Sequence, residues 1–207
     1  KSRREVTLNT ELSEGLELRV PIVSAPMDTV CGGLMAARLA EFGALGIVHR
    51  YNTIEKQTEI VSKASDSGLK NVGAAIGITG DYVERAASLI DAGASVLCLD
   101  VVHGDHVLMH AGAYNIVDRF SEKAHIMAGN IATYTGALAL AQIGVDSLRV
   151  GIGGGSICST RIQTGHGMPT LASVIECVRA KEKYPDLKII ADGGIKTSGD
   201  MVKALAA

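Results

Sequence analysis

The chain has 207 residues, of which 47% are apolar and 20% charged, a composition that provides a packed core and excludes a disordered protein. Lys and Arg number 20 against 22 Asp and Glu, and the formal charge of −2 excludes a strongly basic nucleic-acid-binding protein. With two Phe, five Tyr and no Trp, the chain is also poor in the aromatic side chains on which single-stranded nucleic acids stack.

The four cysteines, Cys31, Cys98, Cys158 and Cys177, are far apart in the sequence, and no two form a Cys-x-x-Cys pair. This spacing indicates a reducing compartment and argues against a zinc ribbon or a disulfide scaffold. No run reaches about 18 apolar residues and no apolar segment follows the basic start, so we expect neither a membrane span nor a signal peptide. We therefore expect a cytoplasmic protein.

Short apolar runs alternate with helical patterns from one end of the chain to the other. The predicted strands are 21–24, 46–49, 71–77, 95–101, 125–129, 147–151 and 188–192. The predicted helices include 33–42, 54–64, 81–92, 133–143 and 171–183. The strands are continuously apolar, which is typical of parallel strands covered on both faces. The repeat predicts one α/β domain spanning 1–207.

Two architectures fit this repeat, a doubly wound sheet and a (β/α)8 TIM barrel. Polar or special residues follow most predicted strands, and such a ring favours the barrel, whose functional residues lie at the carboxyl ends of the strands. Seven strands are found and the seventh helical pattern runs to Ala207, so we expect the eighth βα unit to be absent from this chain. A barrel open in this way exposes strand edges, which indicates a longer chain or a covering partner.

A glycine-rich segment, 151–169, lies in the longest interval between two predicted strands. Four of its first five residues are glycines, which allow tight turns and present backbone N–H groups to an anion. Ser156 adds a hydroxyl donor, and Cys158 follows with Arg161 nearby, a setting that lowers the pKa of a thiol. The alternative is a flexible glycine loop whose cysteine has no role.

Six motifs in chain order resemble those of the inosine monophosphate dehydrogenase and guanosine monophosphate reductase family, together with the segment around Cys158. They are Pro21-Ile-Val-Ser-Ala-Pro-Met-Asp-Thr-Val, Gly46-Ile-Val-His-Arg, Val72-Gly-Ala-Ala-Ile-Gly, Asp100-Val-Val-His-Gly, Ala128-Gly-Asn-Ile-Ala-Thr and Ile190-Ala-Asp-Gly-Gly-Ile. The resemblance covers nearly the whole chain, and it implies that a mobile flap of the family belongs to the C-terminal part that we expect to be absent from this chain.

The resemblance implies a role for each matching residue. Cys158 is the expected nucleophile toward C2 of the purine, and Thr160 assists proton transfer. The implied substrate-binding residues are Ser24, Met27, Ser156, Ile157, Asp192 and Gly194. The implied residues on the cofactor side are Asp100, Asn130, Arg149 and Gly151. In dehydrogenases of the family, backbone carbonyls matching Gly153, Gly155 and Cys158 bind potassium.

The family contains two reactions, and the motifs are divided between them. Dehydrogenases oxidise inosine monophosphate (IMP) with NAD to xanthosine monophosphate (XMP), and reductases convert guanosine monophosphate (GMP) with NADPH to IMP and ammonia. Ser24-Ala-Pro-Met-Asp and His103-Gly resemble dehydrogenases, whereas Val174-Ile-Glu-Cys and the missing CBS domain pair after the second helix resemble reductases. We favour the NAD-dependent dehydrogenase, with the reductase as the alternative.

Some features depart from the family pattern or lie outside it. Gly154 stands where Pro is usual, Ser159 where Thr is usual, and Thr170 where Gln is usual. A non-catalytic nucleotide-binding remnant and a flavin-dependent barrel are alternatives of other classes. His103, His106 and His110 are spaced as metal ligands could be, but surface histidines are the simpler interpretation, and His166 is given no role. The family also implies a homotetramer.

Overall fold

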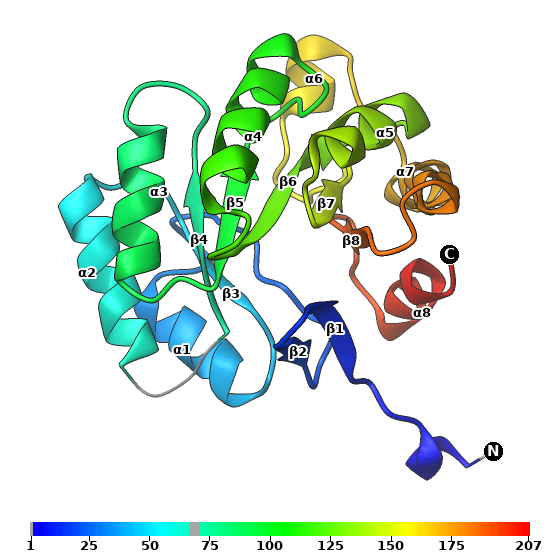
Figure 1. Cartoon of the computed structure of the whole chain (residues 1–207). Helices are drawn as coiled ribbons and strands as arrows, with labels where there is room; N and C mark the ends of the chain where they lie inside the picture. Colours follow the sequence, from blue (N-terminus) through cyan, green and yellow to red (C-terminus); the bar gives the residue numbers. More distant parts are fainter. Residues whose placement is uncertain (1, 67–70) are drawn as a thin grey trace. The chain divides into compact units, whose positions relative to one another are not determined.

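The structure is a computed structural model that describes residues 2–66 and 71–207. Six strands are hydrogen-bonded in the order β3-β4-β5-β6-β7-β8, which is also their order in the sequence, and helices alternate with them along the chain (Figure 1). Each assigned pairing, β3 with β4, β6 with β7 and β7 with β8, is parallel. Parallel strands in sequence order, alternating with helices, are the pattern of a partial (β/α)8 barrel, and the predicted fold class is confirmed.

The chain divides into two compact units, which are described separately. The first comprises Lys1–Ile76, Asp81–Cys98 and Lys123–His125, and the second comprises Gly77–Gly80, Leu99–Glu122 and Ile126–Ala207. The expectation of one domain over 1–207 stays a prediction. The expected direct connection from the second helix to the next strand crosses 67–70, which lie outside the described residues.

The first unit contains a short 3-10 turn, a hairpin and the first βα repeats. Its elements are η1 (Arg3–Glu5), β1 (Thr10–Ser13), β2 (Leu16–Leu18), α1 (Gly33–Glu41), β3 (Gly46–Val48), α2 (Ile54–Ser65), β4 (Val72–Ile76), α3 (Tyr82–Asp91) and most of β5 (Val96–Asp100). The hairpin was not predicted, because its strands have only four and three residues. A Cβ at Gly46 would lie 2.4 Å from Cα of Ala36, so glycine at 46 lets α1 pack directly against β3.

The predicted strand at 21–24 is wrong, because the structure forms only an isolated bridge there, between Val23 and Leu45. Pro21 has no N–H to donate, and the N–H of Ile22 turns back to the carbonyl of Val20 at 2.7 Å. The ladder therefore stops after the hydrogen bonds that Leu45 makes with Ile22 and Ser24.

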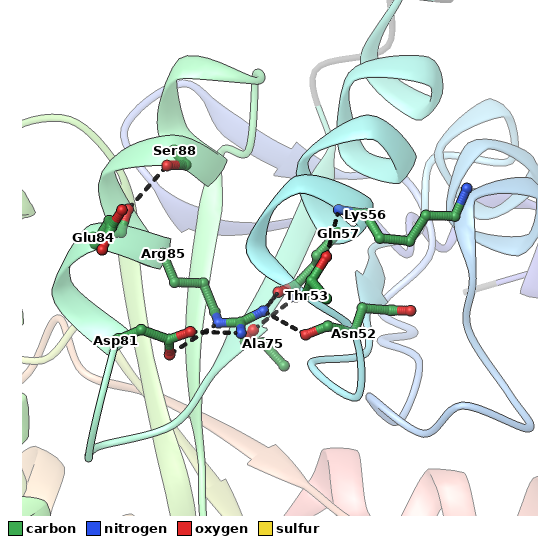
Figure 2. A network of polar contacts seen from close by, with 9 residues as sticks. All are labelled: Asn52, Thr53, Lys56, Gln57, Ala75, Asp81, Glu84, Arg85 and Ser88. Carbon is green, nitrogen blue, oxygen red and sulfur yellow. Dashed lines mark hydrogen bonds and ion pairs between the residues drawn. The ribbon is translucent and has the colours of Figure 1, made fainter.

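A buried polar network joins α2, β4 and α3 within the first unit (Figure 2). Gln57 is fully buried and donates to the carbonyl of Ala75 at 2.8 Å. Arg85, which is 8% exposed, donates to Gln57 Oε1 at 2.8 Å, to the carbonyl of Asn52 at 3.0 Å and to Asp81 at 2.9 Å. One guanidinium thus satisfies acceptors on three segments, and its planar set of donors suits this task better than an ammonium would.

Replacing Arg85 with Met should lower the free energy of unfolding by about 2–3 kcal/mol, because buried acceptors on Gln57 and Asn52 lose their donor. Arg85→Lys should recover part of this loss. Urea unfolding measures the effect, and Arg38→Met, which breaks an exposed ion pair to Glu41, is the matched control that should leave the midpoint unchanged. Equal midpoints for the Arg85 and Arg38 variants would contradict the prediction.

The second unit carries the remaining repeats. Its elements are α4 (Val107–Phe120), β6 (His125–Ile131), α5 (Tyr134–Ile143), β7 (Ser147–Val150), α6 (Thr160–Thr164), α7 (Thr170–Val178), η2 (Arg179–Glu182), β8 (Lys188–Ala191) and α8 (Ser198–Ala206). In register, Leu148 on β7 lies between Ala128 on β6 and Ile189 on β8. Within the described residues, no helix combines the length and the apolar character that crossing a membrane requires.

Candidate active site

The carboxyl ends of the strands in the second unit bring together most of the binding residues predicted there. Asp100 is the last residue of β5, Asn130 lies near the end of β6, and Asp192 follows β8 directly. Nδ2 of Asn130 donates to Asp192 Oδ2 and, at 2.8 Å, to the carbonyl of Gly151. Because parallel strands end at one edge of a sheet, residues far apart in the sequence meet there.

Arg149 on β7 connects two of these carboxylates. Its Nη1 lies 2.6 Å from Asp100 Oδ1 and its Nη2 lies 2.9 Å from Asp192 Oδ2. The arginine side chain is 7% exposed, whereas those of Asp100 and Asp192 are 19% and 25% exposed. The guanidinium therefore lies beneath two partly exposed carboxylates and fixes both by charge-assisted hydrogen bonds.

The glycine-rich segment after β7 folds back on itself. The N–H of Met168 donates to the carbonyl of Ile152 at 3.0 Å and closes the loop. A Cβ at Gly153 or Gly167 would come within 2.5 or 2.4 Å of Cγ of Arg161. The two glycines therefore leave room for the aliphatic part of Arg161 between the two arms of the loop.

Cys158 lies on this loop, half-buried, with its Sγ 3.3 Å from Oγ1 of Thr160. The Thr160 hydroxyl, the Thr160 N–H and then the charge of Arg161 lower the pKa of the Cys158 thiol, and partial burial opposes them less strongly. A thiol held in this way supplies more thiolate at neutral pH, which is the nucleophilic form.

The other three cysteines are packing residues. Cys31, Cys98 and Cys177 are fully buried. Burial raises the pKa of Cys31, and burial together with Glu176 raises the pKa of Cys177 to about 12. The thiols of Cys31 and Cys177 stay protonated at neutral pH, so Cys158 differs from both in exposure and acidity.

Replacing Thr160 with Val should raise the pKa of the Cys158 thiol, because the hydroxyl that stabilises the thiolate is removed. The rate of alkylation by iodoacetamide, followed against pH, should have its midpoint at higher pH in the variant, while the limiting rate at high pH stays the same. Thr164→Val, whose hydroxyl donates to the carbonyl of Thr160, is the control. A midpoint that does not move would show that Thr160 has no part in the acidity.

The remaining predicted substrate-binding residues have two settings. Ser156, Ile157 and Gly194 are exposed in the second unit, and a cavity of about 580 Å³ beside them is lined by residues that include Gly154, Arg161, Gly194 and Lys203. Ser24 and Met27 belong to the first unit. There the Ser24 hydroxyl accepts the N–H of Ile47 at 2.9 Å, and Met27 is half-buried. These assignments stay predictions.

The histidines do not form a metal site in the part of the chain that the structure describes. His106 Nδ1 accepts the N–H of Leu108 and caps α4, and His110 lies 3.2 Å from Asp105. Both hydrogen bonds described for His166 join it to Thr164 in the same turn, and the one between the His166 ring and the Thr164 carbonyl is 2.8 Å long.

Sequence reasoning missed two features of the site. It placed Arg149 on the cofactor side without its link between Asp100 and Asp192, although a charged residue inside the buried run Ser147–Val150 signals a buried partner. It also noted Thr170 only as a departure from the family pattern, whereas its hydroxyl donates to the carbonyl of Gly193 at 3.0 Å.

Comparison with known proteins identifies the family of the chain. The family model described as "IMP dehydrogenase / GMP reductase domain" matches residues 1–207. The chain belongs to this family. An IMP dehydrogenase of Nitrosopumilus maritimus is 44% identical over 100% of the chain and 69% of the relative, and one of Cryptosporidium parvum is 34% identical over 98% and 60%. A GMP reductase of Leishmania major is 42% identical over 79% of the chain and 33% of the relative.

The chain thus spans about 60–69% of the length of the first two relatives. The resemblance found in the sequence motifs is confirmed at the level of the family. Both kinds of enzyme named in the family are among the relatives, so the family alone does not select the reaction.

Proposed function

We propose that this chain carries the NAD-dependent oxidation of IMP to XMP through a covalent adduct on Cys158. The observation that carries the proposal is the setting of Cys158, a half-buried thiol of lowered pKa on a glycine-rich loop. The loop is packed against the backbone after β8, since a Cβ at Gly151 would lie only 2.2 Å from the carbonyl oxygen of Asp192. The 44% identity to the dehydrogenase of Nitrosopumilus maritimus, which extends over 100% of the chain, supports the same reaction.

The chemistry begins with a bond between Sγ of Cys158 and C2 of the purine, and it continues as a hydride leaves C2. NAD, when bound, accepts that hydride. Water then adds to C2, the carbon–sulfur bond breaks, and XMP leaves with the thiolate restored. The Thr160 hydroxyl, 3.3 Å from Sγ, is placed to transfer a proton in the hydrolytic step.

The polar residues around the loop fit the two nucleotides by their chemistry. Partly exposed carboxylates suit ribose hydroxyls, so Asp192 holds the ribose of the substrate and Asp100 that of the cofactor, with Asn130, Arg149 and Gly151 on the cofactor side. Ser156 and the N–H of Gly194 bind the substrate phosphate. The other proposed substrate-binding residues are Ser24, Met27 and Ile157, of which Met27 is proposed to contact the base.

Carbonyls of the same loop suit a potassium ion, which prefers oxygen ligands. The proposed ligands are the carbonyls of Gly153, Gly155 and Cys158. The carbonyl of Gly155 accepts the N–H of Cys158 at 3.2 Å and retains acceptor capacity, because a carbonyl oxygen has two lone pairs. Exchanging potassium for lithium at constant ionic strength should slow turnover, and a rate independent of the cation would contradict the ion site.

The second candidate is the GMP reductase reaction, in which NADPH reduces GMP to IMP and ammonia. It is supported by the 42% identity to the reductase of Leishmania major. The same cysteine would attack C2 and ammonia would leave; NADPH, when bound, would supply the hydride to C2, and the carbon–sulfur bond would break to release IMP and the thiolate.

Absorbance of the reduced nicotinamide distinguishes these reactions. The protein is assayed with IMP, NAD and potassium, and separately with GMP and NADPH. A rise in the first assay establishes the dehydrogenase, and a fall in the second alone overturns the proposal in favour of the reductase. Silence in both from folded protein would leave the nucleotide-binding remnant as the better interpretation.

We also propose a cytoplasmic homotetramer. The four free cysteines support a reducing compartment, and the tetramer rests on the family. Light scattering coupled to size-exclusion chromatography tests the assembly, and a monomeric mass would contradict it.

A further inference from the structure

Thr170, the first residue of α7, connects that helix to the end of β8. Its hydroxyl donates to the carbonyl of Gly193 at 3.0 Å, and Gly193 directly follows Asp192. A short β-branched side chain has little rotameric freedom, so this hydrogen bond fixes Oγ1 at one place. The second point of contact of that oxygen is the Cys158 loop.

Gly154 is the part of the loop that meets Thr170. A Cβ at position 154 would lie 2.3 Å from Thr170 Oγ1, a distance that excludes any side chain. Unlike Gly153, whose φ is +80°, Gly154 is not among the glycines with positive φ. The backbone at 154 therefore tolerates a side chain, and only the Thr170 hydroxyl requires glycine there.

The backbone after β8 also lies close to the backbone of the Cys158 loop. A Cβ at Gly193 would lie 3.0 Å from the N of Gly155, and one at Gly194 would lie 3.0 Å from the carbonyl oxygen of Gly154. The loop therefore rests directly on the backbone after β8. A displacement of Gly154 also moves its neighbour Gly155. The carbonyl of Gly155 accepts the N–H of Cys158, so the displacement is passed on to Cys158.

We propose that Gly154 and Thr170 are a matched pair that sets the position of the Cys158 loop on the end of β8, and that Thr170 is a positioning residue for Cys158. The proposal rests on the proposed function in taking Cys158 as the nucleophile. The oxygen at 170 occupies the space that a side chain at 154 would need.

The other contacts of position 154 make the pair separable by mutation. After Thr170 Oγ1, the nearest atom to a Cβ at 154 is the carbonyl oxygen of Gly193, at 3.5 Å, which is ordinary van der Waals distance. Removing the hydroxyl alone therefore makes room for alanine at 154. Thr170→Ser keeps the hydroxyl and keeps the conflict.

The test is a double-mutant cycle of Gly154→Ala and Thr170→Ala. Gly154→Ala alone should lower kcat/KM and the rate of Cys158 alkylation by about tenfold or more, because small displacements of a reacting group are costly. The double variant should recover most of that loss, and Gly154→Ala with Thr170→Ser should recover none. Additive effects in the cycle, or recovery with serine, would overturn the proposal.

Two controls keep the result interpretable. Gly199→Ala on α8, where the nearest atom to a Cβ is 3.6 Å away, should leave all rates unchanged, and thermal unfolding verifies that each variant is folded. Alkylation by iodoacetamide needs no nucleotide, so it separates the two hypotheses. If the two substitutions are coupled in alkylation but neither IMP nor GMP is turned over, the matched pair is supported and the proposed function is contradicted. If IMP or GMP is turned over but the effects of the two substitutions are additive, the proposed function is supported and the matched pair is contradicted.

Discussion

Replacing Cys158 with Ala should abolish turnover of IMP, with kcat lowered at least about a thousandfold, because the reaction loses the atom that bonds to C2. Cys31, Cys98 and Cys177 cannot substitute for it, since all three are fully buried. IMP binding, measured by calorimetry, should change little, because the phosphate and ribose contacts are proposed to come from other residues. Stopped-flow absorbance of the reduced nicotinamide measures the chemical step.

Cys177→Ala is the matched control for this prediction. Cys177 contacts the carbonyl of Thr133 at 3.5 Å, and its pKa is raised to about 12, so its removal should cost some stability and leave kcat within about twofold. A 6-chloropurine nucleotide provides a second readout, in which Sγ of Cys158 bonds to C2, a proton moves from C2 to C6, chloride leaves C6, and the protein gains the mass of the remaining nucleotide. Labelling of Cys158→Ala, or turnover that survives in it, would contradict the assignment of the nucleophile.

The βα repeat was predictable because each strand from β3 to β8 is a short apolar run bounded by polar or glycine residues. α4 is instructive, since the alternation of strands and helices requires a helix there but no bounds were predicted for it, although it has 14 residues. Gly112 and Asn115 lower its helix propensity. Met109, Ala113, Ile116 and Phe120 are buried along one face, and their packing overrides that preference.

The predicted strand at 21–24 is the opposite case, a predicted element that the structure does not form. The residues around Val23 are apolar enough for a buried strand, but periodicity does not report which N–H groups are available. Pro21 lacks its own, and the N–H of Ile22 is taken by Val20. A strand requires a continuous ladder, so the segment forms one bridge instead.

The candidate site was predictable where a residue follows a strand and not where it depends on distant partners. Asp100 and Asp192 were identified at strand ends, and the structure brings both to Arg149. The arginine lies 49 residues from the first aspartate and 43 from the second, so no local pattern encodes the connection. The contact between Gly154 and Thr170 was hidden for the same reason.

Replacing Arg149 with Met should lower the free energy of unfolding by about 3–5 kcal/mol, because Asp100 and Asp192 lose the cation that lies between them. The same change should raise KM for both IMP and NAD, since each nucleotide is proposed to use one of the two carboxylates. Urea unfolding and initial rates measure the two effects. Arg119→Met, which removes an exposed arginine from α4, should change neither.

The conservative variant separates charge from geometry. Arg149→Lys keeps the positive charge, but a point-like ammonium cannot donate along the two directions that the guanidinium uses for Asp100 and Asp192. Stability should therefore recover more fully than the two KM values. If lysine restored both KM values, the guanidinium would act only as a counter-charge. If neither KM changed in Arg149→Met, the two carboxylates would not be the groups that hold the riboses. The expected result is that both KM values stay raised in Arg149→Lys. It would mean that the Arg149 guanidinium orients the substrate and cofactor sites together.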